Sequence, residues 1–147
     1  MDPIVLIAGT PDAVVTAKLA LGPGFSYRLA YNVGDAISKL SPDLDVILCN
    51  VTFDNSQMFD FIRAARSLNS KKIIPIVCFR LRPLTEVMHH ALELSLREFE
   101  LTSFVDLHIL RRQGSEDAAL SALRNAVLRV ISELPGPSTI LIQRPTH

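Results

Sequence analysis

The chain has 147 residues, which is enough for one domain with a full-sized core and too few for two ordinary domains. Fifteen Lys and Arg balance fifteen Asp and Glu, so no excess of positive charge favours a nucleic acid or an anionic membrane as partner. No apolar run approaches the roughly 18 residues of a membrane-spanning helix, and the first residues lack the basic start of a secretory signal. We therefore expect a soluble, cytoplasmic protein.

Charged residues make up 20% of the chain, below the usual share of about 25%, while hydrophobic residues reach 48%. The surface therefore holds less charge than usual, and part of its apolar area is expected to contact a partner. Cys49 and Cys78 lie inside apolar runs without a CxxC spacing. This placement favours two small buried side chains over a disulfide or a metal site.

Short apolar runs rich in Val and Ile predict three strands that are covered on both faces, at residues 4–8, 45–49 and 73–79. Residues 25–31 alternate apolar and polar side chains, which predicts a half-exposed strand at an edge of the sheet. A weaker run at 103–109 predicts the last strand.

Segments of helical period separate these strands. The first helix is expected to begin at Thr10, which offers a capping hydroxyl and is followed by Pro11 and Asp12 in the first turn. Ser115 offers a similar cap for the last helix, and Pro135 ends it. The remaining helices are expected within residues 34–40, 58–68 and 84–96.

Five strands that alternate with five helices predict a doubly wound, flavodoxin-like α/β fold, because parallel neighbouring strands need crossover connections. The expected strand order is 2-1-3-4-5. We expect residues 1–134 to form this domain. Residues 135–147 hold three of the nine prolines and one apolar run, 140–142, and are interpreted as a Pro-rich tail: a linker, a disordered end or an added edge strand.

Ligand sites in this architecture lie at the carboxyl ends of the strands. The residues that follow the predicted strands contain no cluster of carboxylates. A glycine-rich phosphate loop is also missing, since residues 8–11 contain one glycine and Pro11 lacks an amide donor. The alternative that stays open is a small-ligand or anion-binding flavodoxin-like domain, with a small anion beside Gly9, Thr10 and Arg80.

The stretch from Pro42 to Arg66 resembles the phosphoacceptor strand, loop and third helix of response-regulator receiver domains. In that family an apolar strand ends in Asp, and the later helix reads roughly G-x-E-x-x-R; Asp60 and Arg63 fall on this helix pattern. The next predicted strand contains a proline, Pro75, as in the family. In element order and length the resemblance covers nearly the whole predicted domain.

The resemblance also identifies the positions that carry the chemistry of receivers. These are two acids that hold Mg²⁺, the phosphorylated Asp, a Ser or Thr after the fourth strand, and a Lys after the fifth. In this chain they hold, in that order, Ala8 and Gly9, Asn50, Arg80, and Leu107 or His108. A hard cation is not held without carboxylates, and an amide is a poor nucleophile. The resemblance therefore implies a pseudo-receiver, which is a receiver fold without phosphotransfer, metal or cofactor.

Such a module is expected to act through protein contacts in a two-component phosphorelay, with a kinase, regulator or output domain as partner. The contact face of receivers corresponds here to Arg111, Arg112 and Leu128, and a homodimer is a further expectation. We do not expect an enzyme, because His89 and His90 diverge on one helix, His108 is isolated and Cys49 is expected to be buried and inert.

Two other acids stand near the predicted strand ends. Asp54 follows Asn50 in the loop, and Asp12 lies in the first helical turn. Their plain roles are to keep the loop solvated and to complement the positive end of the helix dipole. A sharper hypothesis pairs one of them with Arg80, so that a guanidinium permanently fills the space of the missing cation.

Overall fold

The computed structural model describes residues 2–53, 57–68, 73–83, 85–98 and 103–132. These residues form a five-stranded parallel sheet in the order β2-β1-β3-β4-β5. The strands are β1 Ile4–Ala8, β2 Ser26–Ala30, β3 Val46–Asn50, β4 Ile76–Arg80 and β5 Ser103–Asp106. The predicted fold class and strand order are therefore confirmed.

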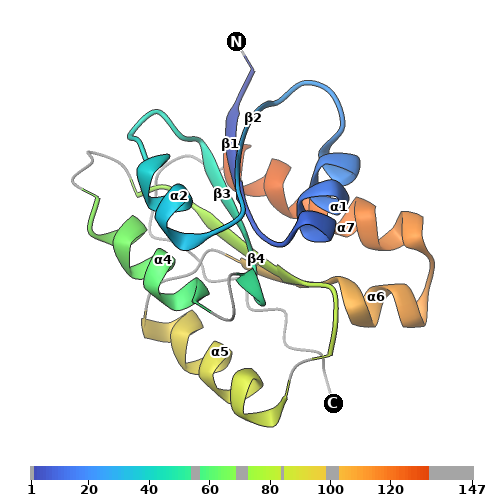
Figure 1. The fold of residues 1–147 in the computed structure, drawn as a ribbon. Coiled ribbons are helices and arrows are strands. Elements are labelled where there is room, and N and C mark those ends of the chain that lie inside the picture. The colour runs from blue at the N-terminus through green and yellow to red at the C-terminus, as the bar shows by residue number, and fades with distance from the viewer. Residues whose placement is uncertain (1, 54–56, 69–72, 84, 99–102, 133–147) are drawn as a thin grey trace.

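Helices cover both faces of the sheet (Figure 1). Their bounds are α1 Pro11–Leu21, α2 Val33–Ser38, α4 Met58–Arg66, α5 Glu86–Glu98, α6 Leu107–Gln113 and α7 Glu116–Ser132. Side chains of α1 and α7 pack on one face, where they share a core with Leu48 and Phe79. Side chains of α2, α4 and α5 pack on the other, where the core includes Cys49 and Cys78. The sheet thus separates two hydrophobic layers.

The burial of the strands follows their place in the sheet. The three central strands, β1, β3 and β4, are buried almost throughout, as continuous apolar runs predict for strands covered on both faces. Strand β2 lies at an edge and keeps partly exposed side chains, as its alternation predicts. No helix in the described ranges is long and apolar enough to cross a bilayer.

The chain departs from expectation around the last strand. The run at 103–109 predicts one strand, but β5 ends at Asp106 and α6 begins at Leu107. The Asp106 carboxylate accepts a hydrogen bond from the Ile109 amide at 3.0 Å, which caps the helix. The apolar residues of this segment are compatible with a strand or with a short helix, so their periodicity alone does not locate the boundary between β5 and α6.

The two predicted helix caps behave differently. The Ser115 hydroxyl accepts a hydrogen bond from the Ala118 amide at 3.1 Å, so this cap is confirmed. Thr10 stands at the cap position of α1, but its hydroxyl makes no capping bond. It donates instead to the Asp12 carboxylate at 2.6 Å. The expected end of the last helix before Pro135 and the tail at 135–147 lie outside the described residues.

Candidate functional site

Asn50 is the last residue of β3 and lies at the carboxyl edge of the sheet, where this architecture places its sites. Its side chain is almost fully enclosed, since the residue is 1% exposed. Ala8 ends the neighbouring strand β1 and is fully buried in the opposite layer. A neutral amide and a methyl group thus occupy two of the positions where the resemblance expects acids.

Gly9 fills the third of these positions, and its surroundings leave little room for a side chain. A Cβ atom built on Gly9 would lie 3.0 Å from the Asn50 Cβ and 3.2 Å from the Ala13 Cβ. Both of these atoms are attached directly to backbone in a strand or a helix, so neither yields without a backbone shift. The packing at this edge of the sheet therefore leaves no room for a carboxylate side chain at position 9.

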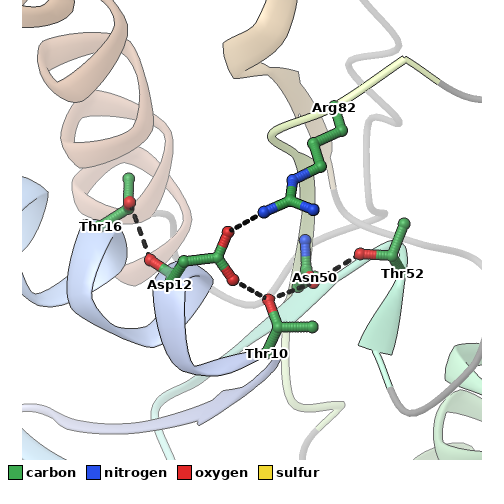
Figure 2. A network of polar contacts seen from close by, with 6 residues as sticks. All are labelled: Thr10, Asp12, Thr16, Asn50, Thr52 and Arg82. Carbon is green, nitrogen blue, oxygen red and sulfur yellow. Dashed lines mark hydrogen bonds and ion pairs between the residues drawn. The ribbon is translucent and has the colours of Figure 1, made fainter.

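A polar network surrounds Asn50 at the start of α1 (Figure 2). The Thr52 hydroxyl donates to the Asn50 Oδ1 at 3.0 Å, and the Thr10 hydroxyl lies 3.4 Å from the same oxygen. Thr10 has one hydroxyl hydrogen, and its contact with Asp12 is much shorter at 2.6 Å. Thr10 therefore serves mainly to hold Asp12, while Thr52 holds the amide of Asn50.

Asp12 has a second partner, Arg82, which follows β4. The Arg82 Nη2 donates to its Oδ2 at 3.1 Å, as Figure 2 shows. The hydrogen bond from Thr10, and then the charge of Arg82, lower the pKa of Asp12 below its usual value, against the opposing effect of partial burial. The carboxylate is thus already engaged by a hydroxyl and a guanidinium, although both charged side chains keep substantial contact with solvent.

The hypothesis that Arg80 pairs with Asp12 is wrong. Arg80 alternates with Phe79 and so shares the sheet face of Cys78, beneath α4 and α5. Its Nη2 lies 2.7 Å from the Asp106 Oδ2. The guanidinium that reaches Asp12 belongs to Arg82. Asp54, the other acid in that hypothesis, lies outside the described residues.

The positions of Arg80 and Arg82 separate the residues that were expected to form an anion site. Arg80 pairs with Asp106 and shares the sheet face of Cys78, and the guanidinium that reaches Asp12, the partner of Thr10, is that of Arg82. Among the described residues, no group of three or more His, Cys, Asp or Glu side chains is placed to hold a metal ion.

Leu107 and His108, the two candidates for the lysine position, fall in the first turn of α6. Leu107 is fully buried in the core layer beneath α7, and His108 is half-buried. The polar side chain at the very end of β5 is that of Asp106, one residue earlier. Sequence reasoning missed Asp106, because the strand was expected to run on to residue 109.

The remaining candidate residues take ordinary structural roles. Cys49 and Cys78 are neighbours in register on β3 and β4, and burial raises the pKa of both thiols, that of Cys78 to about 12. Such thiols are poor nucleophiles at neutral pH. His89 lies 3.5 Å from Glu93 one turn along α5, and His90 is exposed.

The expected contact face lies on α6 and α7. Arg111 is held within the molecule, since its Nη2 donates to the Glu116 Oε1 at 2.8 Å. Arg112 is exposed, and Leu128 is 40% exposed. The structure adds an apolar surface that sequence reasoning missed on α1, where Leu19 is 68% exposed and Val15 is also exposed one turn earlier. Their spacing of four residues was the available signal.

No protein-family model and no curated protein matches the sequence. Solved structures match the fold. A response regulator from Hahella chejuensis has a TM-score of 0.66 at 16% identity, covering 90% of this chain and 100% of that one. The phosphorylated cyanobacterial phytochrome response regulator RcpA has a TM-score of 0.67 at 12% identity, covering 92% and 100%.

A third match is a signal receiver domain of a two-component histidine kinase from Clostridium thermocellum, with a TM-score of 0.61 at 16% identity over 90% of this chain and 98% of that one. The five-stranded sheet of this chain, in the order 2-1-3-4-5, thus lies within a fold that matches these structures over about nine-tenths of its length. The chain therefore has the fold of response-regulator receiver domains. This likeness bears on the fold, and the chemistry of the site has to be argued from its own residues.

Proposed function

We propose that this protein is a pseudo-receiver: a signalling or regulatory module with a receiver fold that is not phosphorylated and acts through protein contacts. The observation that supports this proposal is the set of residues at the carboxyl edge of the sheet. Ala8 and Asn50 are buried and neutral, and the backbone at Gly9 is packed against Asn50 and Ala13.

Phosphoryl transfer at this edge would need a carboxylate nucleophile and Mg²⁺. Mg²⁺ is bound through carboxylate oxygens in near-octahedral geometry, and one or two such anchors are the usual minimum. Asp12 is the carboxylate nearest to Asn50 in the network of Figure 2, and it is already paired with Arg82. An incoming cation would compete with that guanidinium for this single carboxylate.

The proposal extends to how the module acts. A domain that is not switched by phosphate presents one surface continuously, and it shifts a partner's conformation only through the contacts it makes. We propose the α6–α7 surface with Arg112 and Leu128 for these contacts, with a kinase, regulator, output domain or second copy as partner. We also propose residues 1–134 as the receiver-like domain and 135–147 as its tail or linker.

The proposal is tested with a small phosphodonor. The chain is incubated with acetyl phosphate and Mg²⁺, and its intact mass is measured by mass spectrometry over time. We expect no phosphoryl adduct, while a receiver domain with the full acidic set gains one under the same conditions. The Asn50→Asp variant should also stay unmodified, because the carboxylates that would hold Mg²⁺ are still missing.

A rapid, Mg²⁺-dependent gain of one phosphoryl group by the unaltered chain would overturn the proposal. Loss of that adduct in Asp54→Asn would then identify the loop acid as the acceptor. The same measurement on Asp12→Asn distinguishes the acid of the polar network from the acid of the loop.

A further inference from the structure

Asp106 ends β5 and contacts two parts of the molecule with its two carboxylate oxygens. Its Oδ2 lies 2.7 Å from the Arg80 Nη2 at the end of β4. Its Oδ1 accepts a hydrogen bond from the Ile109 amide at 3.0 Å, in the first turn of α6. One side chain therefore joins the edge of the sheet to the helix that follows it.

The pair with Arg80 is the most enclosed ion pair among the described residues. The two side chains are 11% and 20% exposed, whereas every other pair has at least one partner near or above one third. Arg80 and Asp106 are also direct partners in the register of two parallel strands. A charge-assisted hydrogen bond is stronger where water is excluded, so the pair holds a defined geometry.

The guanidinium depends on this contact for its orientation. The Arg80 Nε is buried and has no hydrogen-bond partner within the described part of the chain. Loss of Asp106 would thus leave a buried charge without the partner that the structure gives it, and loss of Arg80 would do the same to Asp106. A charge stranded in this way turns towards water.

The helix that Asp106 caps is the first half of a helical hairpin. Leu107 anchors α6 in the core, and the Gly114 amide ends the helix by donating to the Leu110 carbonyl at 3.0 Å. Arg111 then joins α6 to the first turn of α7 through Glu116. The placement of α6 therefore determines how the hairpin presents its outer surface.

We propose that Asp106 is a latch between the sheet and the α6–α7 hairpin, and that Arg80 positions α6 through its ion pair with Asp106. The latch fixes the hairpin in one arrangement with no covalent modification. That the fixed surface serves partner contacts rests on the proposed function, but the positioning of α6 by Arg80 does not.

Amide hydrogen exchange measures the effect directly. In Arg80→Met the stranded carboxylate leaves its capping position, and we expect the amides of residues 109–113 to exchange about five-fold faster, the effect of losing a helix cap. Arg80→Lys keeps a positive charge and should restore most of the protection. Arg82→Met is the matched control, since Arg82 pairs with Asp12, and should leave these amides unchanged.

Asp106→Asn provides a second route in case Arg80→Met fails to fold. The two carboxylate oxygens each serve one partner, and Asn puts an NH2 group, which only donates, in place of one of them, so one of the two contacts is lost. We expect faster exchange in α6 here too. Urea unfolding of each variant, with the amides of β1 and β3 as internal reference, separates a local effect on α6 from a general loss of stability.

The proposal is overturned if Arg80→Met and Asp106→Asn fold and leave exchange in α6 unchanged relative to β1 and β3. It is also overturned if Arg82→Met or Arg80→Lys loosens α6 as much as Arg80→Met does. The phosphodonor experiment makes no use of α6, so failure of the latch and failure of the pseudo-receiver proposal give different results.

Discussion

Two arginines near the end of β4 show how much depends on the direction of a side chain. Arg80 and Arg82 are two positions apart in the sequence, yet Arg80 pairs with Asp106 and Arg82 with Asp12. A guanidinium next to Asp12 follows from the sequence as a hypothesis, because long basic residues come after the strand. Alternation alone would place residues 80 and 82 on one face, so their different partners arise because β4 ends at Arg80 and Arg82 lies beyond the strand, an end that the sequence does not fix.

At the same scale, the ion pair between Arg28 and Asp43 predicts how the stability of the fold depends on pH. Arg28 holds its carboxylate through two hydrogen bonds, of 3.0 and 2.6 Å, and these, with a further bond from Ser41, lower the pKa of Asp43 to about 2. Because the folded-state pKa lies below the unfolded value, the pair stabilises the fold above about pH 4 and loses this effect as the pH falls towards 2.

We therefore expect Asp43→Asn to lower the free energy of unfolding at pH 5 and to make no difference near pH 2, measured by urea titration at each pH. Arg28→Gln removes the same pair and should follow the same pH window. A difference between Asp43→Asn and the unaltered chain that stays constant from pH 5 to pH 2 would contradict this assignment.

At the scale of elements, the ends of α1 illustrate which signals a sequence carries. Pro11 and Asp12 in the first turn mark its beginning correctly. Its end is set by Gly22, whose φ of +68° is rarely adopted by other residues and whose amide donates to the Lys18 carbonyl at 2.9 Å. The chain then turns into β2, so this residue sets the connection between two elements.

Gly22→Ala is expected to lower the free energy of unfolding by about 1 to 3 kcal/mol, because alanine is strained at this φ although nothing lies within 4 Å of its Cβ. Gly34→Ala is the matched control, because Gly34 lies inside α2. A Cβ atom at this position would be in ordinary van der Waals contact, with the Asn32 Oδ1 nearest at 3.5 Å. This change should leave stability unchanged or raise it by up to about 1 kcal/mol. Equal losses in the two variants, measured by urea unfolding, would refute the role of φ.

At the scale of the whole molecule, the low charge fraction has a counterpart on the surface. Exposed apolar side chains occur on two helices of one layer, with Leu19 on α1 and Leu128 on α7. Single exposed leucines are common in monomers, so their exposure alone does not identify an interface. Only Leu128 lies on the contact face proposed for α6 and α7, so substitutions of Leu19 and Leu128 should have different effects on self-association.

We expect sedimentation at increasing micromolar concentration to show a mass that rises from monomer towards dimer. Leu128→Ser should reduce this self-association, because it removes an apolar side chain from the proposed face. Leu19→Ser is the matched control on the neighbouring helix and should have no effect. A mass of 16.2 kDa at every concentration would contradict the homodimer, and a loss of association in Leu19→Ser alone would move the interface to α1.

The sequence by itself determined the class of fold and the neutral character of the candidate site. Continuous apolar strands and helical periods are local patterns, and they reflect burial by one or two layers whatever the details of packing. The identities of Ala8, Gly9 and Asn50 can likewise be read without a structure. The tertiary structure alone decided the close packing at Gly9, the early end of β5 and the partners of Arg80 and Asp106. These features depend on which side chains meet across neighbouring strands, and such contacts join residues that are far apart in the chain and have no signature in either segment taken alone.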